Sequence, residues 1–159
     1  MNITVIAVGK LREKPYRMMA DEYLKRLGRF GKIREIELDD LPEPANSSPA
    51  IERQIKDREG EAILKQLKPG DYVIALTIPG RMRSSPELAQ RLEKLTGGGV
   101  SQIVFVIGGS CGLSSDVLKR ANETLSFGPI TLPHNLARVV LLEQLYRACK
   151  ISRGEPYHK

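Results

Sequence analysis

The chain has 159 residues, of which 41% are hydrophobic and 28% are charged. These values exclude a disordered or fibrous chain, and no apolar run approaches the roughly 20 residues that a membrane helix needs. The two cysteines, Cys111 and Cys149, lack the spacing of metal ligands, which favours a reducing compartment and argues against a metal site. We therefore expect a soluble, cytoplasmic protein with a single domain over residues 1–159.

Basic residues gather toward the two ends of the sequence. The net charge is +6 over the whole chain, +6 over residues 10–34, −3 over residues 35–143 and +3 over residues 144–159. Clustered basic charge attracts polyanions with an affinity that depends on salt. The same residues could instead solvate a helix face, so charge alone leaves both interpretations open.

Strand-like and helix-like stretches alternate along the chain. Apolar and β-branched runs mark the strands, and a serine or proline marks the start of most helices. In chain order the predicted elements are a strand at residues 2–8, a helix from Pro15, a less buried strand at 32–38, a polar helix at 49–67, a strand at 71–77, a helix at 85–95, a strand at 102–107, a short helix at 116–122, a strand or turn at 124–131 and a helix from Pro133 to about residue 151. This alternation predicts an α/β fold with a mostly parallel sheet flanked by helices.

The last predicted helix is apolar on almost every side. Its residues include Leu136, Val140, Leu141, Leu145 and Tyr146, which leave little polar face. A helix of this kind is buried on most sides. In so small a chain we expect a second subunit to bury it, which predicts a homodimer through this helix; the alternative is a central helix in a tightly packed monomer.

Three loops are expected to meet at the carboxyl edge of the parallel sheet, where ligands bind in α/β folds. They are residues 76–80, residues 107–110 and residues 126–133. All three offer main chain with few bulky side chains, which suits a flat ring held by main-chain hydrogen bonds, although each loop taken alone is more typical of a simple turn. The glycines of the second loop match neither the G-x-G-x-x-G pattern nor a Walker loop, which argues against a Rossmann redox enzyme and an NTPase.

Few side chains are candidates for nucleophilic or acid–base chemistry. Cys111 has no histidine near it in sequence, so a small loop residue is favoured over a nucleophile. His134 lies in the first turn of the last helix, where a structural hydrogen bond is favoured over catalysis. Residues 153–159 could form a frayed end, but they combine a guanidinium, a carboxylate, a phenol and an imidazole. Because arginine and tyrosine can hold phosphate and stack on a base, we expect a tail that contacts substrate.

Four segments of the sequence resemble one known family. They are NITVIAVGKLREK, VFVIGGSCGLS, LSFGPITLPHNLARVVLLEQLYRA and ISRGEPYHK. Together they resemble, over effectively the full chain, the small methyltransferases of the SPOUT superfamily that methylate N3 of a pseudouridine in large-subunit (23S) ribosomal RNA. The combination of IGG, LPH, EQLYRA and PYHK is specific, whereas any one of these strings alone is weak.

The resemblance implies a C-terminal trefoil knot, a homodimer, and S-adenosylmethionine as methyl donor without a metal. The donor positions it implies are Leu76, Gly108, Phe127, Gly128, Pro129, Ile130, Thr131 and Leu132.

The substrate and catalytic positions that it implies are Arg153, Tyr157 and His158, in a tail that completes the neighbouring subunit's pocket. His158 is the candidate proton acceptor, Tyr157 stacks on or orients the base, and Arg153 holds phosphate or stabilises enolate charge. The partner is the large-subunit rRNA, in an assembled ribosome, because so small a chain has no separate RNA-binding domain.

Two other functions are alternatives to methyl transfer. A non-catalytic ribosome-binding factor that has kept the fold is the alternative from another class, and failure to bind S-adenosylmethionine would favour it. The uninterrupted donor loops and the polar tail argue against it. A flavodoxin-like nucleotide-binding module would need a phosphate loop after the first strand, where Gly9 is the only glycine.

Overall fold

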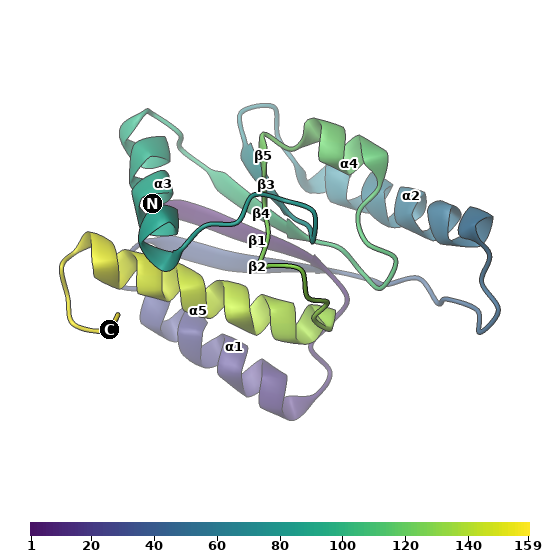
Figure 1. Ribbon diagram of the computed structural model, residues 1–159, viewed down its shortest axis with the longest axis horizontal. Coiled ribbons are helices and arrows are strands. Elements are labelled where there is room, and N and C mark those ends of the chain that lie inside the picture. Colours follow the sequence, from purple (N-terminus) through teal and green to yellow (C-terminus); the bar gives the residue numbers. More distant parts are fainter.

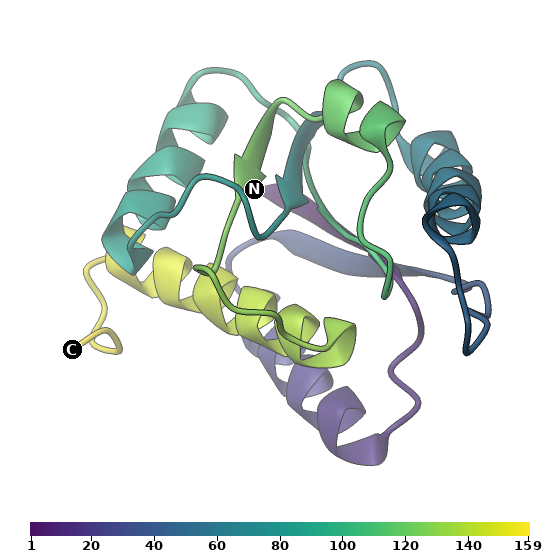
Figure 2. The same cartoon turned by 45° about the vertical axis from the view of Figure 1, so that its right-hand side comes forward.

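The computed structural model describes residues 1–159 and contains a five-stranded sheet and five helices (Figures 1 and 2). In chain order the elements are β1 (Asn2–Val8), α1 (Lys14–Leu27), β2 (Lys32–Leu38), α2 (Pro49–Gln66), β3 (Tyr72–Leu76), α3 (Ser85–Gly97), β4 (Ile103–Ile107), α4 (Ser115–Arg120), β5 (Glu123–Leu125) and α5 (His134–Ser152). All neighbouring strands are parallel, in the order β2-β1-β4-β3-β5. The predicted α/β fold with a parallel sheet is confirmed.

Helices cover both faces of the sheet, with α1, α3 and α5 on one face and α2 and α4 on the other (Figure 2). Successive side chains of a strand point to opposite faces, so Phe105 enters the larger core under α1, α3 and α5, and Val106 enters the smaller one. Burial of both faces explains why β1 and β4 are almost continuously apolar. None of the helices has the length and apolar content to cross a bilayer.

Local signals set the ends of the elements. The Ser84 hydroxyl accepts the Glu87 N–H at 3.3 Å, and the Glu87 carboxylate accepts the Ser84 N–H at 2.6 Å, which forms a capping box at the start of α3. The predicted boundaries lie within about two residues of the observed ones, except at residues 124–131. There the strand ends at Leu125, because Gly128 has a φ of +102° and Pro129 has no N–H to continue the ladder.

Helix α5 is buried largely within its own chain. Eight of its residues are buried, where it packs beside α1 and α3. Most of the burial of this helix therefore requires no second subunit. The apolar residues that stay half-buried in the first half of the helix are Leu136, Ala137 and Val140.

A fully buried arginine attaches α5 to the sheet. The Arg138 guanidinium donates to the Glu35 carboxylate, to Glu37 Oε2 at 2.8 Å and to the Gly9 main-chain oxygen at 3.1 Å. Arg17 of α1 donates to the same Glu35 side chain at 2.6 Å. The alternating pattern of β2 did not indicate that its glutamates face α5, so sequence analysis missed this ion cluster.

Glu37 makes this attachment sensitive to acid. Burial tends to raise its pKa, but hydrogen bonds from Arg138 and from the Leu11 N–H hold the pKa of Glu37 below its usual value. A carboxyl whose pKa is lower in the folded chain stabilises the fold above its unfolded pKa of about 4.3, and this contribution is lost as the pH falls through the folded pKa. We expect the urea midpoint to fall between about pH 6 and about pH 3, and Glu37→Gln to make the fall shallower. An equally steep fall in the variant would contradict this assignment.

Candidate functional site

Three loops lie together at the carboxyl edge of the sheet. Strands β4, β3 and β5 are neighbours, so the segments that follow them leave the sheet side by side (Figure 2). The Thr77 N–H donates to the Leu125 oxygen at 3.0 Å, and the Ser126 N–H donates to the Arg81 oxygen at 2.9 Å. The loop after β3 and the segment after β5 are therefore joined by main-chain hydrogen bonds, next to the glycine loop after β4.

The segment before α5 leaves main-chain donors free. The N–H groups of Phe127, Ile130, Thr131 and Leu132 make no hydrogen bond within the chain. A buried or half-buried N–H needs a partner from water or from a ligand. Free N–H groups beside a glycine loop can recognise a planar, uncharged ring by its edge, without any charged side chain.

The glycine loop is packed closely on itself and on α2. A Cβ on Gly108 would lie 2.8 Å from the main chain of Gly112, and a Cβ on Gly109 would lie 3.0 Å from Glu59 Oε1. Glu59 is only 5% exposed, and its Oε2 accepts the Leu41 N–H at 3.0 Å. Burial raises the pKa of the Glu59 carboxyl. Sequence analysis missed Glu59, because the mostly polar α2 has no clear apolar stripe to show which side faces the sheet.

Neither Cys111 nor His134 has the surroundings of a nucleophile or a base. Burial raises the pKa of the Cys111 thiol, and the Glu43 carboxylate raises it further, whereas a nucleophilic cysteine needs a lowered pKa. A Cβ on Gly9 would lie 2.7 Å from His134 Nε2, so the ring packs directly over this glycine. Neither ring nitrogen of His134 is hydrogen-bonded within the chain. The structure gives His134 a packing contact instead of the expected hydrogen bond.

The C-terminal tail is folded back on α5. The Tyr157 hydroxyl donates to Glu143 Oε1 at 3.2 Å, and its ring packs edge-on against Tyr146 with 4.9 Å between the centroids. The Arg147 guanidinium lies 4.7 Å from the centroid of the Tyr157 ring. Burial, together with Tyr23 and Glu143, raises the pKa of Tyr157 to about 12. These contacts argue against a frayed end.

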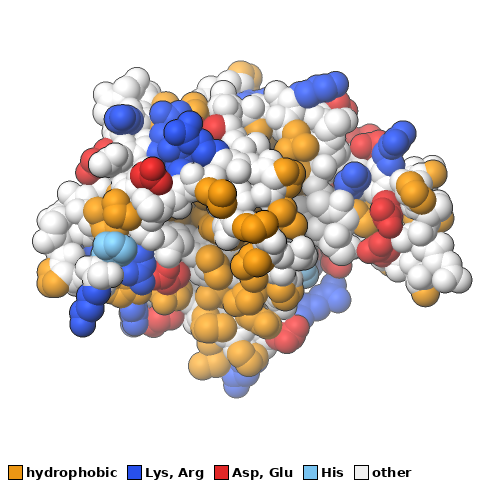
Figure 3. Space-filling model, viewed as in Figure 1, with side chains coloured by type: hydrophobic (Ala, Val, Ile, Leu, Met, Phe, Trp, Pro, Cys, Tyr) orange, Lys and Arg blue, Asp and Glu red, His pale blue; other side chains and the backbone are white.

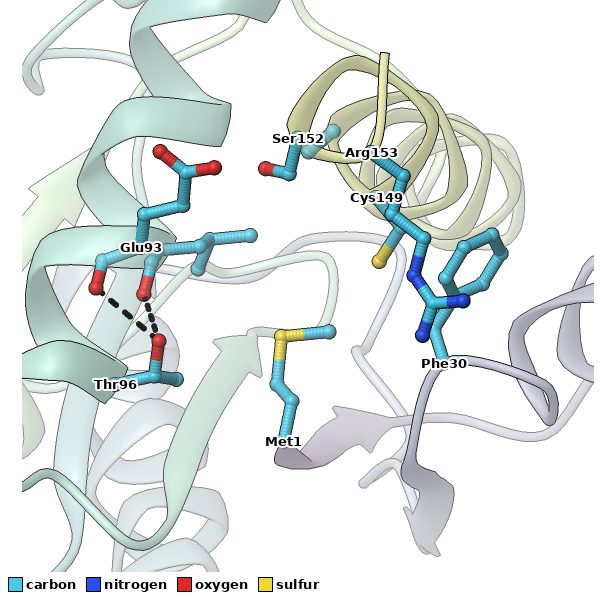
Figure 4. A pocket seen from close by; sticks show the side chains of 9 residues that line it. Met1, Phe30, Glu93, Thr96, Cys149, Ser152 and Arg153 are labelled. Atoms are coloured by element: carbon cyan, nitrogen blue, oxygen red, sulfur yellow. Dashed lines mark hydrogen bonds between the residues drawn. The ribbon is translucent and has the colours of Figure 1, made fainter. Parts of the chain in front are cut away.

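Arg153 and His158 keep their polar groups accessible. The Arg153 guanidinium lies 4.8 Å from the centroid of the Phe30 ring (Figure 4). The neighbouring Glu155 carboxylate pairs instead with Arg29 and Lys150, which leaves Arg153 free to bind an anion.

The ring of His158 is oriented by Arg147, which sequence analysis did not single out. His158 Nδ1 lies 3.3 Å from Arg147 Nη1. A guanidinium can only donate, so Nδ1 is the acceptor and Nε2 carries the ring proton. Nδ1 can take up a proton from a substrate only after its contact with Arg147 has broken.

The predicted donor residues lie before the start of α5, whereas the predicted tail residues lie between its end and its middle. The helix starts two residues after Leu132 and ends one residue before Arg153, and its 19 residues span about 28 Å at 1.5 Å per residue. The tail turns back toward Glu143, and its hydrogen bonds reach α5 and Arg29 but none of the three loops (Figure 1). One chain does not bring the predicted donor residues and the predicted catalytic tail together.

A cavity and an exposed apolar surface lie at opposite edges of the sheet. The cavity lies between α3 and α5 at the amino edge of the sheet, where Met1, Cys149 and Arg153 line it, and it contains none of the predicted donor residues (Figure 4). The loops carry exposed apolar side chains instead, with Ile78 49% and Ile130 57% exposed. The carboxyl edge therefore offers an open apolar surface.

The whole sequence matches known proteins. A family described as "Predicted SPOUT methyltransferase" matches residues 1–158. The chain belongs to the SPOUT methyltransferase family. This SPOUT methyltransferase is 55% identical to "Ribosomal RNA large subunit methyltransferase H" of Alkaliphilus oremlandii (strain OhILAs) and 52% identical to the protein of that name from Bacillus thuringiensis (strain Al Hakam), over 159 residues and 100% of both chains in each case.

Two solved structures share the fold of this SPOUT methyltransferase at low sequence identity. A probable methylase family protein from Haemophilus influenzae Rd KW20 has a TM-score of 0.55 and 16% identity, over 99% of this chain and 70% of that chain. A putative methylase family protein from Neisseria gonorrhoeae has a TM-score of 0.53 and 13% identity, over 91% and 81%. The family establishes a methyltransferase, and these two structures show the fold alone. The trefoil knot stays a prediction.

Proposed function

We propose that this chain transfers a methyl group from S-adenosylmethionine to N3 of a pseudouridine in large-subunit (23S) ribosomal RNA, in the cytoplasm. Family membership supports methyl transfer, and the full-length relatives named as large-subunit rRNA methyltransferases support the acceptor. The observation that carries the proposal is the cluster of three loops with free main-chain donors, in a chain that matches this family from residue 1 to residue 158.

The loop cluster suits an adenosine-bearing donor. Gly108 and Gly128 have no side chain to occupy the site, and the free N–H groups of the segment after Ser126 can bind the edge of an adenine. The proposed donor positions are Leu76, Gly108, Phe127, Gly128, Pro129, Ile130, Thr131 and Leu132. When bound, this donor supplies an electrophilic methyl group on a sulfonium. The chain then has to align the reacting atoms and exclude water.

A homodimer would bring the tail to the loops. Apolar side chains gather over α5 and α1 in Figure 3, and the exposed ones include Ile78, Met82 and Ile130 of the loops and Met18 of α1. A contiguous apolar surface of this kind marks a protein interface. Two α5 helices packed antiparallel about a twofold axis would place the tail of each subunit beside the loops of its partner. This arrangement accounts for the separation of the two groups of site residues in one chain.

Each tail residue has a role in this composite site. The N3 atom carries a proton that must leave as the methyl group arrives, so a base is needed. His158 accepts this proton, directly or through water, once its ring has left Arg147. Tyr157 stacks on or orients the base, and Arg153 holds a phosphate or stabilises the developing enolate charge.

Transfer of labelled methyl from S-adenosylmethionine tests the proposal. The acceptors are assembled ribosomes that lack the modification, separated large subunits, and naked rRNA. Transfer to assembled ribosomes alone would support recognition of ribosome shape by a small basic protein. No transfer to any acceptor by the folded protein would reject the enzyme and favour a non-catalytic ribosome-binding factor.

Arg153→Ala is expected to weaken ribosome binding and to reduce the dependence of affinity on salt by about one counterion. The reason is that its guanidinium has no carboxylate partner and lies at the surface. Affinities measured at several salt concentrations give this slope. Arg58→Ala, which removes an exposed charge from α2 on the opposite face of the sheet, is the matched control. Equal slopes for the wild type and Arg153→Ala would remove the phosphate role.

A further inference from the structure

Ser126 joins two loops of the candidate donor site through its hydroxyl. Its Oγ donates to the main-chain oxygen of Ile78 at 2.6 Å and accepts the Gly128 N–H at 3.1 Å. The residue is only 4% exposed, so little water competes for these bonds. We infer that Ser126 is a positioning residue for methyl-donor binding. This inference rests on the proposed function, and it concerns a residue outside the proposed donor positions.

Within the donor segment, main-chain N–H groups receive no internal hydrogen-bond partner other than Ser126. Among residues 127–132, Gly128 provides the only main-chain N–H that is paired within the chain, and its partner is the Ser126 hydroxyl. The φ of +102° at Gly128 is a conformation that glycine adopts readily and other residues rarely do. No side chain other than Ser126 hydrogen-bonds to this segment. One oxygen atom therefore supplies the hydrogen bonds of the proposed donor-binding main chain, beside the packing of Phe127 on the larger core.

Ser126 is itself fixed to the sheet. It follows Leu125, a 3% exposed residue at the end of β5, and its own N–H donates to the Arg81 oxygen at 2.9 Å. The hydroxyl thus extends from a rigid position to two loops that have little structure of their own. Removal of the hydroxyl leaves the sheet in place and frees the donor segment, because none of the sheet's hydrogen bonds uses Oγ.

Ser126→Ala is expected to weaken the affinity for S-adenosylmethionine about tenfold, as the loss of hydrogen bonds that preorganise a site would do. The kcat at saturating donor and ribosome should stay within about twofold, because Ser126 does not contact the reacting atoms. Calorimetric titration with S-adenosylmethionine, without ribosomes, measures the affinity, and the methyl-transfer assay separates KM for the donor from kcat.

Ser114→Ala is the matched control. Ser114 is also buried, at 3% exposure, and its Oγ accepts the Val117 N–H at 3.3 Å at the start of α4, beyond the glycine loop. Loss of the Ser114 hydroxyl should lower Tm without changing the affinity for the donor. If Ser126 had only a structural role, Ser126→Ala would give the same result. Ser126→Cys fills nearly the same space with a poor hydrogen-bonding atom, so it tests the inference if Ser126→Ala does not fold.

The outcomes are distinct. Weaker binding in Ser126→Ala and Ser126→Cys, with wild-type binding in Ser114→Ala, is the expected result. Wild-type affinity in a folded Ser126 variant would overturn the inference and leave the proposed function intact. If the wild-type protein itself binds no donor, the proposed function fails, and the role of Ser126 in donor binding fails with it.

Discussion

The isolated mixed dimer of two inactive variants is expected to have about half of the wild-type methyl-transfer rate, and the unseparated mixture of dimers about a quarter. One variant carries Arg153→Ala and His158→Ala in the tail, and the other carries Gly128→Val in the donor segment. Valine is disfavoured at a φ of +102°, and its side chain would enter the space in front of the loops. If each pocket combines the loops of one subunit with the tail of its partner, half of the dimers formed at random are mixed, and each mixed dimer has one intact pocket.

Co-expression with two affinity tags isolates the mixed dimer, and labelled methyl transfer to ribosomes measures its activity. Each variant alone should lose at least about a hundredfold in rate, the size expected when a general base is removed. Circular dichroism checks that both variants are folded. The opposite arrangement, a pocket built within one chain, predicts no recovery, because no subunit of the mixed dimer has both an intact tail and an intact donor segment. Absence of recovery would therefore reject the proposed antiparallel arrangement of α5.

Arg138→Met is expected to lower the free energy of unfolding by about 3 kcal/mol, the cost of breaking a buried ion pair by removal of one partner. The guanidinium is fully buried, and its loss leaves the Glu35 and Glu37 carboxylates without their main partner on α5. Arg17 still pairs with Glu35, which limits the loss. Equilibrium unfolding in urea measures the effect.

Two further variants show whether the unpaired charge causes the loss. Adding Glu37→Gln to Arg138→Met should recover part of the stability, since Glu37 loses its 2.8 Å partner in Arg138→Met and the only charged partner it keeps is Arg17 at 3.6 Å. Arg26→Met breaks an exposed pair with Glu22 on α1 and should leave the midpoint unchanged. A similar loss in Arg138→Met with and without Glu37→Gln would assign the effect to packing instead of charge.

Most of the elements could be predicted because their signals are local. The apolar run of β4, the capping box at Ser84 and Glu87, and the glycines of the loops act within a few residues of one another. The parallel arrangement then followed from the alternation of strands and helices, and with it the position of three loops at one edge of the sheet. The three loops were accessible to sequence analysis for this reason, whereas the individual donor positions came from the resemblance to the family and stay a prediction.

Residues that depend on distant partners were not predictable in the same way. Arg138 is separated from Glu35 by 103 positions, and nothing in the periodicity of α5 indicates that one arginine enters the core. Ser126 looks like any loop serine until its hydroxyl is seen between Ile78 and Gly128. The burial of Glu59 under Gly109 depends in the same way on how α2 sits against the glycine loop.

The sequence by itself determined the fold class, the order and ends of most elements, the three loops and, through its motifs, the family. These properties depend on periodicity, turn residues and capping, which act over one or two helical turns. Only the tertiary structure decided that α5 is buried mainly by its own chain, that Arg138 fixes it to β2, and that the tail folds back on the second half of α5 and reaches none of the three loops. These properties depend on which faces meet when helices pack on the sheet, and side chains far apart in sequence settle that together.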